Sequence, residues 1–344
     1  MACAESKNHL IQFLVDSWKD PKRRQQLSNK TMFVTCGEKC IKFTQESHEE
    51  IEALKSDQEE ADTRLLLHAK HASVSYPALL IIADDTDVFI IALGLCRQIN
   101  SEMFIRRGNK TRLRLVNISR LATALGVEVC TALLGLHPWT GCDTVSTLAG
   151  QGELKRLKLI TQNEKYRDAF TSLGSQWDLS SEVFNTIQEF TCKLYSRNSK
   201  VHEVNELRYD IFQCHRGEID SAQLPPCENT LLQHTRRANY QAAIWRRSLD
   251  NSPAIPDPTE GHGWAKCQHG SLMINWMTTS PAPEMVIDLI SCRCTRACRP
   301  SECTCMLNGI KCTAACKLME CANMVDEDSD DHYQDAADMC DGDL

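Results

Sequence analysis

The segment ALLIIADDTD, residues 78–87, decides the fold of this chain. It begins with a continuous apolar run of strand length, and the acidic sequence Asp84-Asp85-Thr86-Asp87 follows directly. Because a strand that is apolar on both faces suits a parallel sheet covered by helices, the segment predicts an α/β fold. Carboxylates at the carboxyl ends of such strands can gather around Mg²⁺ or Mn²⁺, since these ions prefer oxygen ligands.

Helical patterns flank this strand in the sequence. Residues 59–73 are expected to form a helix that Ser56 or Asp57 caps. The side chains expected to be buried on it are those of Leu65, Leu66 and Ala69. Residues 118–134 indicate a further helical stretch with a break at Gly126. The alternation of helix and strand therefore predicts a partial parallel sheet flanked by helices.

Composition and charge indicate the domain organisation. Of the 344 residues 42% are apolar, so the chain can bury a sizeable core. The net charge of −8 comes from nine acidic residues between Asp326 and Asp343, a stretch that is expected to be disordered. The rest of the chain is nearly neutral, so its charge does not exclude a nucleic-acid partner. The expected regions are a lead-in at 1–58, a core at 59–163, a helical and Pro-rich region at 164–289, a cysteine-rich module at 290–323 and an acidic tail at 324–344.

The sequence lacks signals for a membrane or for secretion. No apolar run reaches the ~18 residues needed to span a bilayer, and residues 1–19 lack a basic start followed by an apolar stretch. We therefore expect a reducing compartment and no membrane partner. In that compartment the 19 cysteines are expected to bind metal or to stay free, and not to form disulfides.

Eight of the cysteines lie within thirty residues near the carboxyl end of the chain. A segment this short cannot bury an apolar core, whereas zinc held by thiolates supplies the folding free energy of many small domains. Free or oxidised thiols are the alternative, which the density of the cluster disfavours. The expected zinc ligands are Cys292, Cys294, Cys298, Cys303, Cys305, Cys312, Cys316 and Cys321.

This spacing resembles the tesmin-type CXC family. The matching pieces are Cys303-Thr304-Cys305, Gly309-Ile310-Lys311-Cys312 and Cys321-Ala322-Asn323. Because that family binds a compact zinc cluster through nine cysteines and contacts DNA, the resemblance implies zinc, a DNA partner and a nuclear location. Leu318 stands in place of the ninth cysteine, and Glu302 in place of a DNA-contacting tyrosine. The side chains expected to meet DNA phosphate are those of Arg293, Arg296 and Lys311.

Five acidic residues form a second candidate site. Glu60 and Asp62 lie at the start of the first predicted helix, and Asp85 and Asp87 follow the strand. Asp143 follows the second helical stretch. Together such carboxylates could hold two divalent ions that activate water and stabilise the leaving oxygen in phosphodiester cleavage. Taken alone, an acidic pair at the start of a helix more often caps the helix or interacts with its dipole. An acidic pair after a strand more often forms a turn.

The order of these motifs resembles the internal part of flap-endonuclease-type nucleases, which have a PIN-like fold. The matching pieces are Glu60-Ala61-Asp62, Asp85-Thr86-Asp87, Leu133-Leu134-Gly135, Gly141-Cys142-Asp143 and Gly150-Gln151-Gly152. The resemblance implies a structure-specific nuclease that uses Mg²⁺ or Mn²⁺, with the five acids as its catalytic residues. It also implies that Gly150 and Gly152 lie in a hairpin that presents backbone N–H groups to DNA. A nuclease-like part followed by a CXC module is similar to chains associated with mobile elements.

The front of the chain departs from that family. Active members carry two further aspartates before the first helix, whereas residues 1–58 contain only Asp16, Asp20 and Asp57, outside a matching strand. A fragment, an inactive descendant and a gene model that starts too late are the open explanations. We expect a zinc-containing, DNA-associated protein derived from a metal-dependent nuclease, and enzymatic activity stays open. The alternative is a non-enzymatic DNA- or chromatin-binding protein with a degenerate nuclease-like scaffold.

Two smaller patterns favour structural roles. His68 and His71 lie three residues apart on one helix, where surface or core histidines are more common than metal ligands. A second pattern, in which two arginine pairs flank aromatic residues, favours a solvated basic helix, with nucleic-acid contact as the second choice. Its members are Arg236, Arg237, Tyr240, Trp245, Arg246 and Arg247.

Overall fold

The computed structural model describes residues 2–108, 112–214, 223–267, 269–280, 291–312, 316–318, 321 and 323. The chain divides into two compact units, Met1–Trp276 and Met277–Leu344. The first unit is a mixed α/β structure, and the second contains a cluster of cysteines. The acidic tail predicted at residues 324–344 lies outside the described residues.

A helix and a small antiparallel sheet begin the first unit. The elements are α1 (Ala2–Trp18), α2 (Pro21–Arg24), the 3₁₀ turn η1 (Gln25–Leu27), β1 (Met32–Cys36), β2 (Lys39–Phe43), β3 (His48–Glu50) and the 3₁₀ turn η2 (Glu52–Leu54). Val15, Leu27 and Phe43 form a small core between the helices and this sheet. The buried Cys40 packs against Leu67 of the next helix and so joins the sheet to the rest of the unit.

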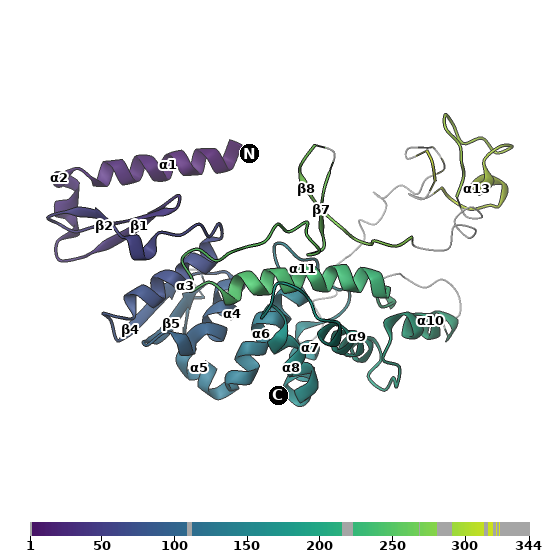
Figure 1. Ribbon diagram of the computed structural model, residues 1–344, viewed down its shortest axis with the longest axis horizontal. Helices are drawn as coiled ribbons and strands as arrows, with labels where there is room; N and C mark the ends of the chain where they lie inside the picture. Colours follow the sequence, from purple (N-terminus) through teal and green to yellow (C-terminus); the bar gives the residue numbers. More distant parts are fainter. Residues whose placement is uncertain are drawn as a thin grey trace. The chain divides into compact units, whose positions relative to one another are not determined.

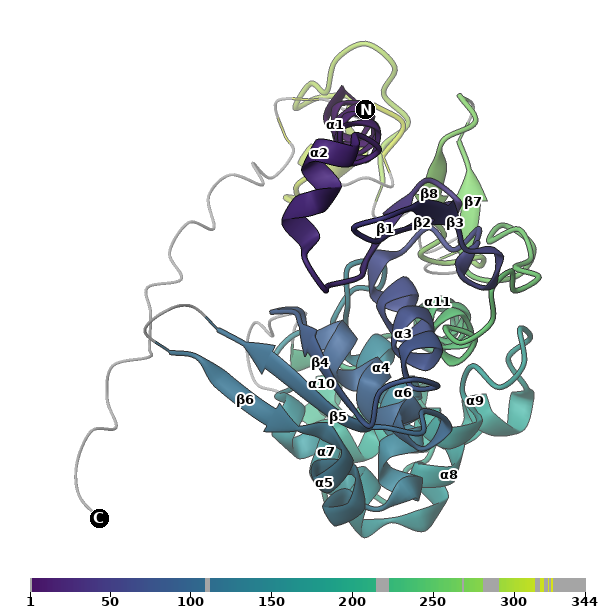
Figure 2. The same cartoon turned by 90° about the vertical axis from the view of Figure 1, so that its left-hand side faces the viewer.

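The predicted strand is an edge strand of a second sheet. The elements are α3 (Ala61–Ala72), β4 (Ala78–Ile82), α4 (Thr86–Leu95), the 3₁₀ turn η3 (Cys96–Gln98), β5 (Glu102–Arg107) and β6 (Arg114–Asn117). The strand order is β4-β5-β6, and β4 runs parallel to β5 whereas β5 and β6 are antiparallel. The sheet is therefore mixed and not wholly parallel. Figure 2 shows its three strands, with α3 and α4 beside β4.

Only one face of this sheet is buried in the described part of the chain. Ile81 and Ile105, opposite each other in the parallel pair, are 7% and 0% exposed. On the other face Leu80, Ile82 and Leu115 are 54%, 60% and 62% exposed. The buried residues of α4 and α5, and Leu66 and Ala69 of α3, join the core on the face of Ile81 and Ile105. The expectation that helices cover both faces of the strand is therefore wrong for the described chain.

The first predicted helix begins later than expected. The N-cap of α3 is Glu60, and neither Ser56 nor Asp57 caps it. The buried residues on its core face are Thr63, Leu66, Leu67 and Ala69. Leu65 was also expected in the core but is 37% exposed, because the helical spacing of Thr63, Leu66 and Ala69 turns it away.

The predicted break at Gly126 is confirmed. α5 (Ile118–Leu125) and α6 (Val127–Thr140) meet there at 102°, and Gly126 has a φ of +84°, which favours glycine. Within the described ranges no single helix is long and apolar enough to cross a membrane, although this bent pair passes that test by length and composition.

Helices form most of the remaining first unit. They are α7 (Glu153–Gln162), α8 (Glu164–Ser172), α9 (Ser181–Tyr195), α10 (Val204–Cys214) and α11 (Glu228–Arg246). A second core surrounds Trp139, which packs edge-on against Phe170 and Phe190. α11 lies along α6 and α9 (Figure 1), with Leu231 in this second core and Trp245 in the core beneath the sheet. The helix therefore joins the two cores across the predicted division at residue 163.

α11 is a buried helix and not a solvated basic one. Arg237 is 1% exposed, and its Nη1 donates to the carbonyl oxygens of Gly263 and Asn275 at 3.2 and 2.9 Å. Arg246 donates to the carbonyl oxygens of Thr131, Phe170, Thr171 and Leu173. Buried guanidinium groups need such acceptors, so these two arginines serve packing. The expectations of a solvated face and of nucleic-acid contact are both wrong for them.

A hairpin of β7 (Trp264–Lys266) and β8 (Leu272–Ile274) lies near the end of the first unit. In the second unit the described helix is α13 (Thr304–Leu307), a single turn. Apart from Ser291, the buried side chains that the structure describes in this unit are cysteines. Thiol groups thus occupy the place that apolar residues fill in the first unit.

Candidate functional site

Acidic residues gather at the amino ends of two helices. Glu60 is the N-cap of α3 and Asp62 lies in its first turn, and Asp85 and Asp87 hold the same positions on α4. Asp85 Oδ1 accepts a hydrogen bond from the backbone N–H of Asp87 at 2.8 Å. Asp143 lies in the tight turn that follows α6. The amino ends of α3 and α4 carry partial positive charge, which favours negative side chains beside them.

The five predicted acids come together, and this group is called the carboxylate cluster below. Oxygens of Asp62, Asp85 and Asp87 lie within 4.8 Å of one another. The pKa of Asp62 rises to about 6, first because burial disfavours its charge and then because of the nearby charges of Asp85, Asp87, Glu60 and Asp143. In the described ranges no lysine or arginine forms an ion pair with any of the five. This excess of negative oxygen ligands fits a hard divalent cation.

The carboxylate of Glu60 is fixed by α11. Its Oε1 accepts a hydrogen bond from Nε2 of Gln241 at 2.8 Å, and its Oε2 accepts one from the indole N–H of Trp245 at 3.2 Å. Gln241 Oε1 in turn accepts a hydrogen bond from the hydroxyl of Thr144 at 2.8 Å. The sequence analysis missed these partners, because nothing in the local pattern shows that α11 lies against the start of α3.

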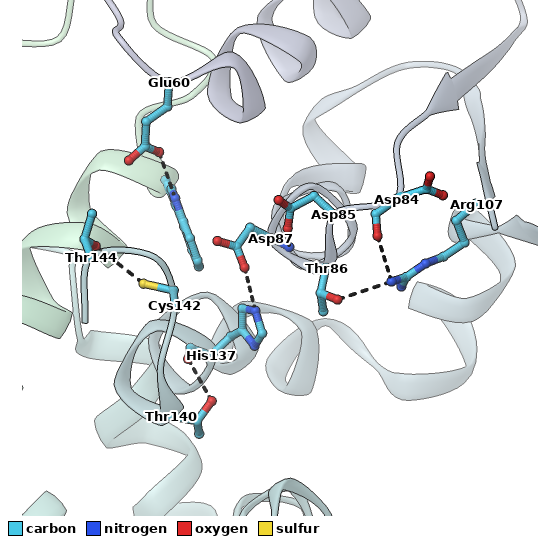
Figure 3. A network of polar contacts seen from close by, with 11 residues as sticks. Glu60, Asp84, Asp85, Thr86, Asp87, Arg107, His137, Thr140, Cys142 and Thr144 are labelled. Carbon is cyan, nitrogen blue, oxygen red and sulfur yellow. Dashed lines mark hydrogen bonds and ion pairs between the residues drawn. The ribbon is translucent and has the colours of Figure 1, made fainter. Parts of the chain in front are cut away.

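His137 is a further residue that the sequence analysis missed. Its Nε2 lies 2.9 Å from Oδ1 of Asp87 (Figure 3). Its ring stacks on Trp245 with a centroid distance of 5.9 Å. His137 lies between Leu133-Leu134-Gly135 and Gly141-Cys142-Asp143, two of the pieces that carry the resemblance to the nuclease family. A lone imidazole in the otherwise apolar stretch at residues 132–139 of α6 was the available signal.

Asp84 does not share the environment of its neighbours. Its Oδ1 accepts a hydrogen bond from the backbone N–H of Gly108 at 2.6 Å. Its carbonyl oxygen accepts one from Arg107, which also bonds to Thr86 (Figure 3). Asp84 is also not among the charges that raise the pKa of Asp62. It is therefore an adjacent aspartate with a structural role.

Gly150 and Gly152 lie in a turn that leads into α7. Gly150 has a φ of +67°, and a Cβ atom at either glycine would meet nothing within 4 Å. The backbone here is open, as the prediction of a phosphate contact requires. In the part of the chain that the structure describes, no hydrogen bond joins these glycines to the carboxylate cluster. Their role in DNA contact stays a prediction.

The eight predicted cysteines also come together, and they form three overlapping groups of sulfur atoms. The groups are Cys292, Cys303, Cys305 and Cys312; Cys292, Cys294, Cys298 and Cys303; and Cys298, Cys312 and Cys321. Cys316 joins them through Cys305, with 3.5 Å between the sulfurs. Four of the cysteines belong to two groups each, so their thiolates could bridge metal ions. Sulfur ligands in compact groups of four are compatible with zinc.

Hydrogen-bond donors lie beside two of these cysteine sulfurs, Cys303 and Cys312. The backbone N–H of Met306 is the main cause that lowers the pKa of the Cys303 thiol to about 6. Thiolates, not thiols, bind zinc, so this effect favours a ligand role. The side chain of Asn323 donates to Cys312 Sγ at 3.3 Å and to the carbonyl of Ile310 at 3.1 Å. The described cysteines are all free of disulfides.

Basic side chains border the cysteine cluster. A surface hollow of about 520 Å³ is lined by Arg293, Arg296 and Arg299 together with Glu302. The structure thus brings together two of the three predicted phosphate contacts and adds Arg299. Lys311, the third, does not line this hollow. The carboxylate of Glu302 reduces the positive charge of the hollow.

The predicted histidine pair has structural partners. His68 Nε2 lies 3.1 Å from the hydroxyl of Thr35, and His71 packs edge-on against Phe33. Burial lowers the pKa of His68. These contacts hold α3 against the N-terminal sheet, which agrees with the structural interpretation of the pair.

Comparison of the chain with models of protein families, with curated proteins and with solved structures gives no match.

Proposed function

We propose that the chain acts on DNA in the nucleus as a nuclease-type phosphodiesterase that depends on Mg²⁺ or Mn²⁺. The observation that carries this proposal is the convergence of Glu60, Asp62, Asp85, Asp87 and Asp143, which come from three separate segments. Structural acids usually pair with bases, whereas here burial and the charges of the other four acids raise the pKa of Asp62. Such a group of carboxylates is typical of a divalent-cation site.

Each residue of the cluster has a distinct part. Asp62, Asp85 and Asp87 would hold the cation, since their oxygens lie within 4.8 Å of one another. Glu60 is oriented by Gln241 and Trp245, and Asp143 adds a carboxylate from its turn. When bound, the cation would supply Lewis acidity and an activated water for phosphodiester hydrolysis.

The cysteine cluster would bind zinc and hold the module beside DNA. Zinc supplies the folding free energy that a segment without an apolar core lacks. The hollow lined by Arg293, Arg296 and Arg299 offers guanidinium groups, which pair with phosphate oxygens. The module would thus contribute affinity for DNA and leave the reaction to the carboxylate cluster.

A second candidate is a DNA-binding protein without enzymatic activity. One observation favours it: three acids of the cluster have structural partners. Glu60 accepts hydrogen bonds from Trp245, Asp87 contacts His137, and Asp85 caps α4. In that case the cluster would be a scaffold, and the zinc module alone would carry the function.

Cleavage of flap and hairpin DNA in Mn²⁺ separates the two candidates. The test variant is Asp85→Asn with Asp87→Asn, in which asparagine can still cap α4. The matched control is Asp84→Asn, an adjacent aspartate outside the cluster. The nuclease proposal predicts cleavage by the wild type and by the control only. Equal cleavage by all three proteins, or none by any, would overturn it, and DNA binding without cleavage would support the second candidate.

A further inference from the structure

The second face of the β4-β5-β6 sheet is apolar and yet exposed in the described part of the chain. Side chains alternate along each strand, so the residues on this face are those opposite to Ile81 and Ile105, and the surface they form is called the open face below. Its apolar members are Leu80, Ile82, Phe104 and Leu115. The three aliphatic ones are each more than half exposed, and Phe104 is half-buried.

The apolar residues of the open face form one continuous patch. Leu80 of β4 pairs with Phe104 of β5 in the parallel ladder, and Leu115 of β6 lies opposite the next residue of that face, Arg106. Strands in parallel pairs are usually covered on both faces, and a contiguous exposed apolar patch usually marks an interaction site. β4 is also an edge strand, which leaves one side of its backbone open to a further chain.

The central strand adds a pattern of charge to this patch. On the open face Phe104 lies midway between Glu102 and Arg106, which are both exposed. Within the described ranges neither forms an ion pair, and Oε1 of Glu102 accepts a hydrogen bond from Nδ2 of Asn117 at 2.7 Å. One end of the strand is therefore negative and the other positive. Such a surface is complementary to a copy of itself that runs in the opposite direction.

We propose that the open face binds the open face of a second copy of this chain, with the two β5 strands antiparallel. The twofold axis then passes beside Phe104, and Glu102 of each copy faces Arg106 of the other. A twofold interface uses the same patch on both copies, and sheets pack face to face with their strands nearly aligned. The apolar residues supply the affinity, and the charges set the orientation.

This interface goes beyond the proposed function and does not depend on it. Because β4 leads directly into the acidic sequence at 84–87, the antiparallel arrangement puts the two carboxylate clusters at opposite ends of the interface. Dilution separates the copies and returns the open face to solvent, and in that state Ile82 contributes little to folding.

The first test is sedimentation velocity of the zinc-loaded full chain across a range of protein concentrations, without DNA. Wild type should show a monomer–dimer equilibrium. Leu80→Asp puts a carboxylate without a partner into the interface and should weaken association at least about tenfold. Phe13→Asp is the matched control, because Phe13 is an exposed apolar residue of α1, away from the open face, and it should leave association unchanged.

Charge reversal then tests the contact between Glu102 and Arg106. Glu102→Arg alone and Arg106→Glu alone each place like charges against each other between copies and should weaken association. An equimolar mixture of these two variants brings opposite charges together again and should associate about as well as wild type. Only a contact between two copies can produce this rescue, and circular dichroism spectra verify that each variant is folded.

Three results would overturn the inference. The first is a wild type that stays monomeric at all concentrations, which would leave the open face to a partner other than a second copy. The second is an equal loss of association in Leu80→Asp and Phe13→Asp, which would place α1 at the interface in place of the second sheet. The third is a mixture of the two charge variants that associates no better than either variant alone.

Discussion

The indole N–H of Trp245 donates a hydrogen bond to the carboxylate of Glu60 across 185 residues of sequence, at 3.2 Å. The same indole stacks on His137, which contacts Asp87. One buried side chain thus links the acids at the start of α3 with those at the start of α4. The geometry of the carboxylate cluster therefore depends on a helix that lies far from it in the sequence.

Loss of this indole donor should weaken metal binding as well as the fold. Trp245→Phe keeps an aromatic ring against His137 but removes the donor to Glu60, and the lost buried hydrogen bond should cost about 1–2 kcal/mol. Trp139→Phe is the matched control, because its indole donates to Thr235 at 3.2 Å, in the second core. We expect similar denaturation midpoints for the two variants, and a several-fold loss of Mn²⁺ affinity in Trp245→Phe alone. Equal Mn²⁺ affinities would contradict the role given to Trp245.

Protonation of Asp62 should make the stability of the metal-free protein depend on pH. Burial and then the nearby acidic charges raise the pKa of Asp62 to about 6 in the folded chain, against its ordinary value of 3.8, so folding favours the protonated form. This stabilisation is fully present below pH 3.8 and is lost as the pH rises through 6. Asp62→Asn should therefore raise the melting temperature relative to wild type at pH 7.5 and not at pH 4. A difference that does not change with pH would count against a raised pKa at Asp62.

Added Mn²⁺ should reverse the order of the melting temperatures of wild type and Asp62→Asn at pH 7.5. At pH 7.5 the ion offsets the repulsion among the acids and should raise the melting temperature of wild type. Asp62→Asn lacks one ligand and should gain less. Thermal melts with and without Mn²⁺ measure both effects, and an equal gain for the two proteins would place the ion elsewhere.

Adjacent isoleucines on β4 should differ sharply in their contribution to stability. Ile81 is 7% exposed and Ile82 is 60% exposed. Ile81→Ala should lower the free energy of unfolding by about 2–4 kcal/mol, because it opens a cavity in the core. Ile82→Ala should change it by less than about 0.5 kcal/mol. Denaturant unfolding checks this, and a large effect at Ile82 would show that something covers that face.

Removal of zinc should unfold the second unit and spare the first. On the proposed function, a chelator would take away the ion that stands in for an apolar core in the cysteine module. Cys303→Ser should lower the zinc content more than Cys321→Ser, because Cys303 belongs to two sulfur groups and Cys321 to one. Hydrogen exchange and metal analysis provide the readouts. Loss of protection in α6 on chelation, or equal zinc contents of the two variants, would contradict this arrangement.

The sequence was enough to predict which residues form the two candidate sites, but not which residues surround them. Asp85 and Asp87 could be placed because they directly follow a strand, and the cysteines because of their density. The structural role that such acidic pairs more often have is also present in part, because Asp85 caps α4 and belongs to the carboxylate cluster as well. Local patterns reveal residue type and spacing, and those two properties were enough for the candidate ligands.

Tertiary contacts explain what the sequence could not reveal. The basic residues of α11 suggest a solvated helix face, yet Arg237 and Arg246 donate hydrogen bonds to main-chain carbonyl oxygens of distant segments. The apolar run of β4 predicts burial on both faces of the strand, yet the face that carries Leu80 and Ile82 is exposed. His137 lies between two of the matching pieces and belongs to neither of them. In each case the outcome depends on which segment packs alongside, and a single sequence does not encode that in a local pattern.

Titration of the zinc-loaded protein with Mn²⁺ at pH 7.5 tests the central claim, a divalent-cation site made by the carboxylate cluster, most directly. Free Mn²⁺ is followed by its paramagnetic resonance signal. We expect wild type and Asp84→Asn to bind Mn²⁺ with the same affinity, and Asp85→Asn with Asp87→Asn to bind it at least about tenfold more weakly, since two charged ligands are lost. Equal binding by all three proteins would contradict the account.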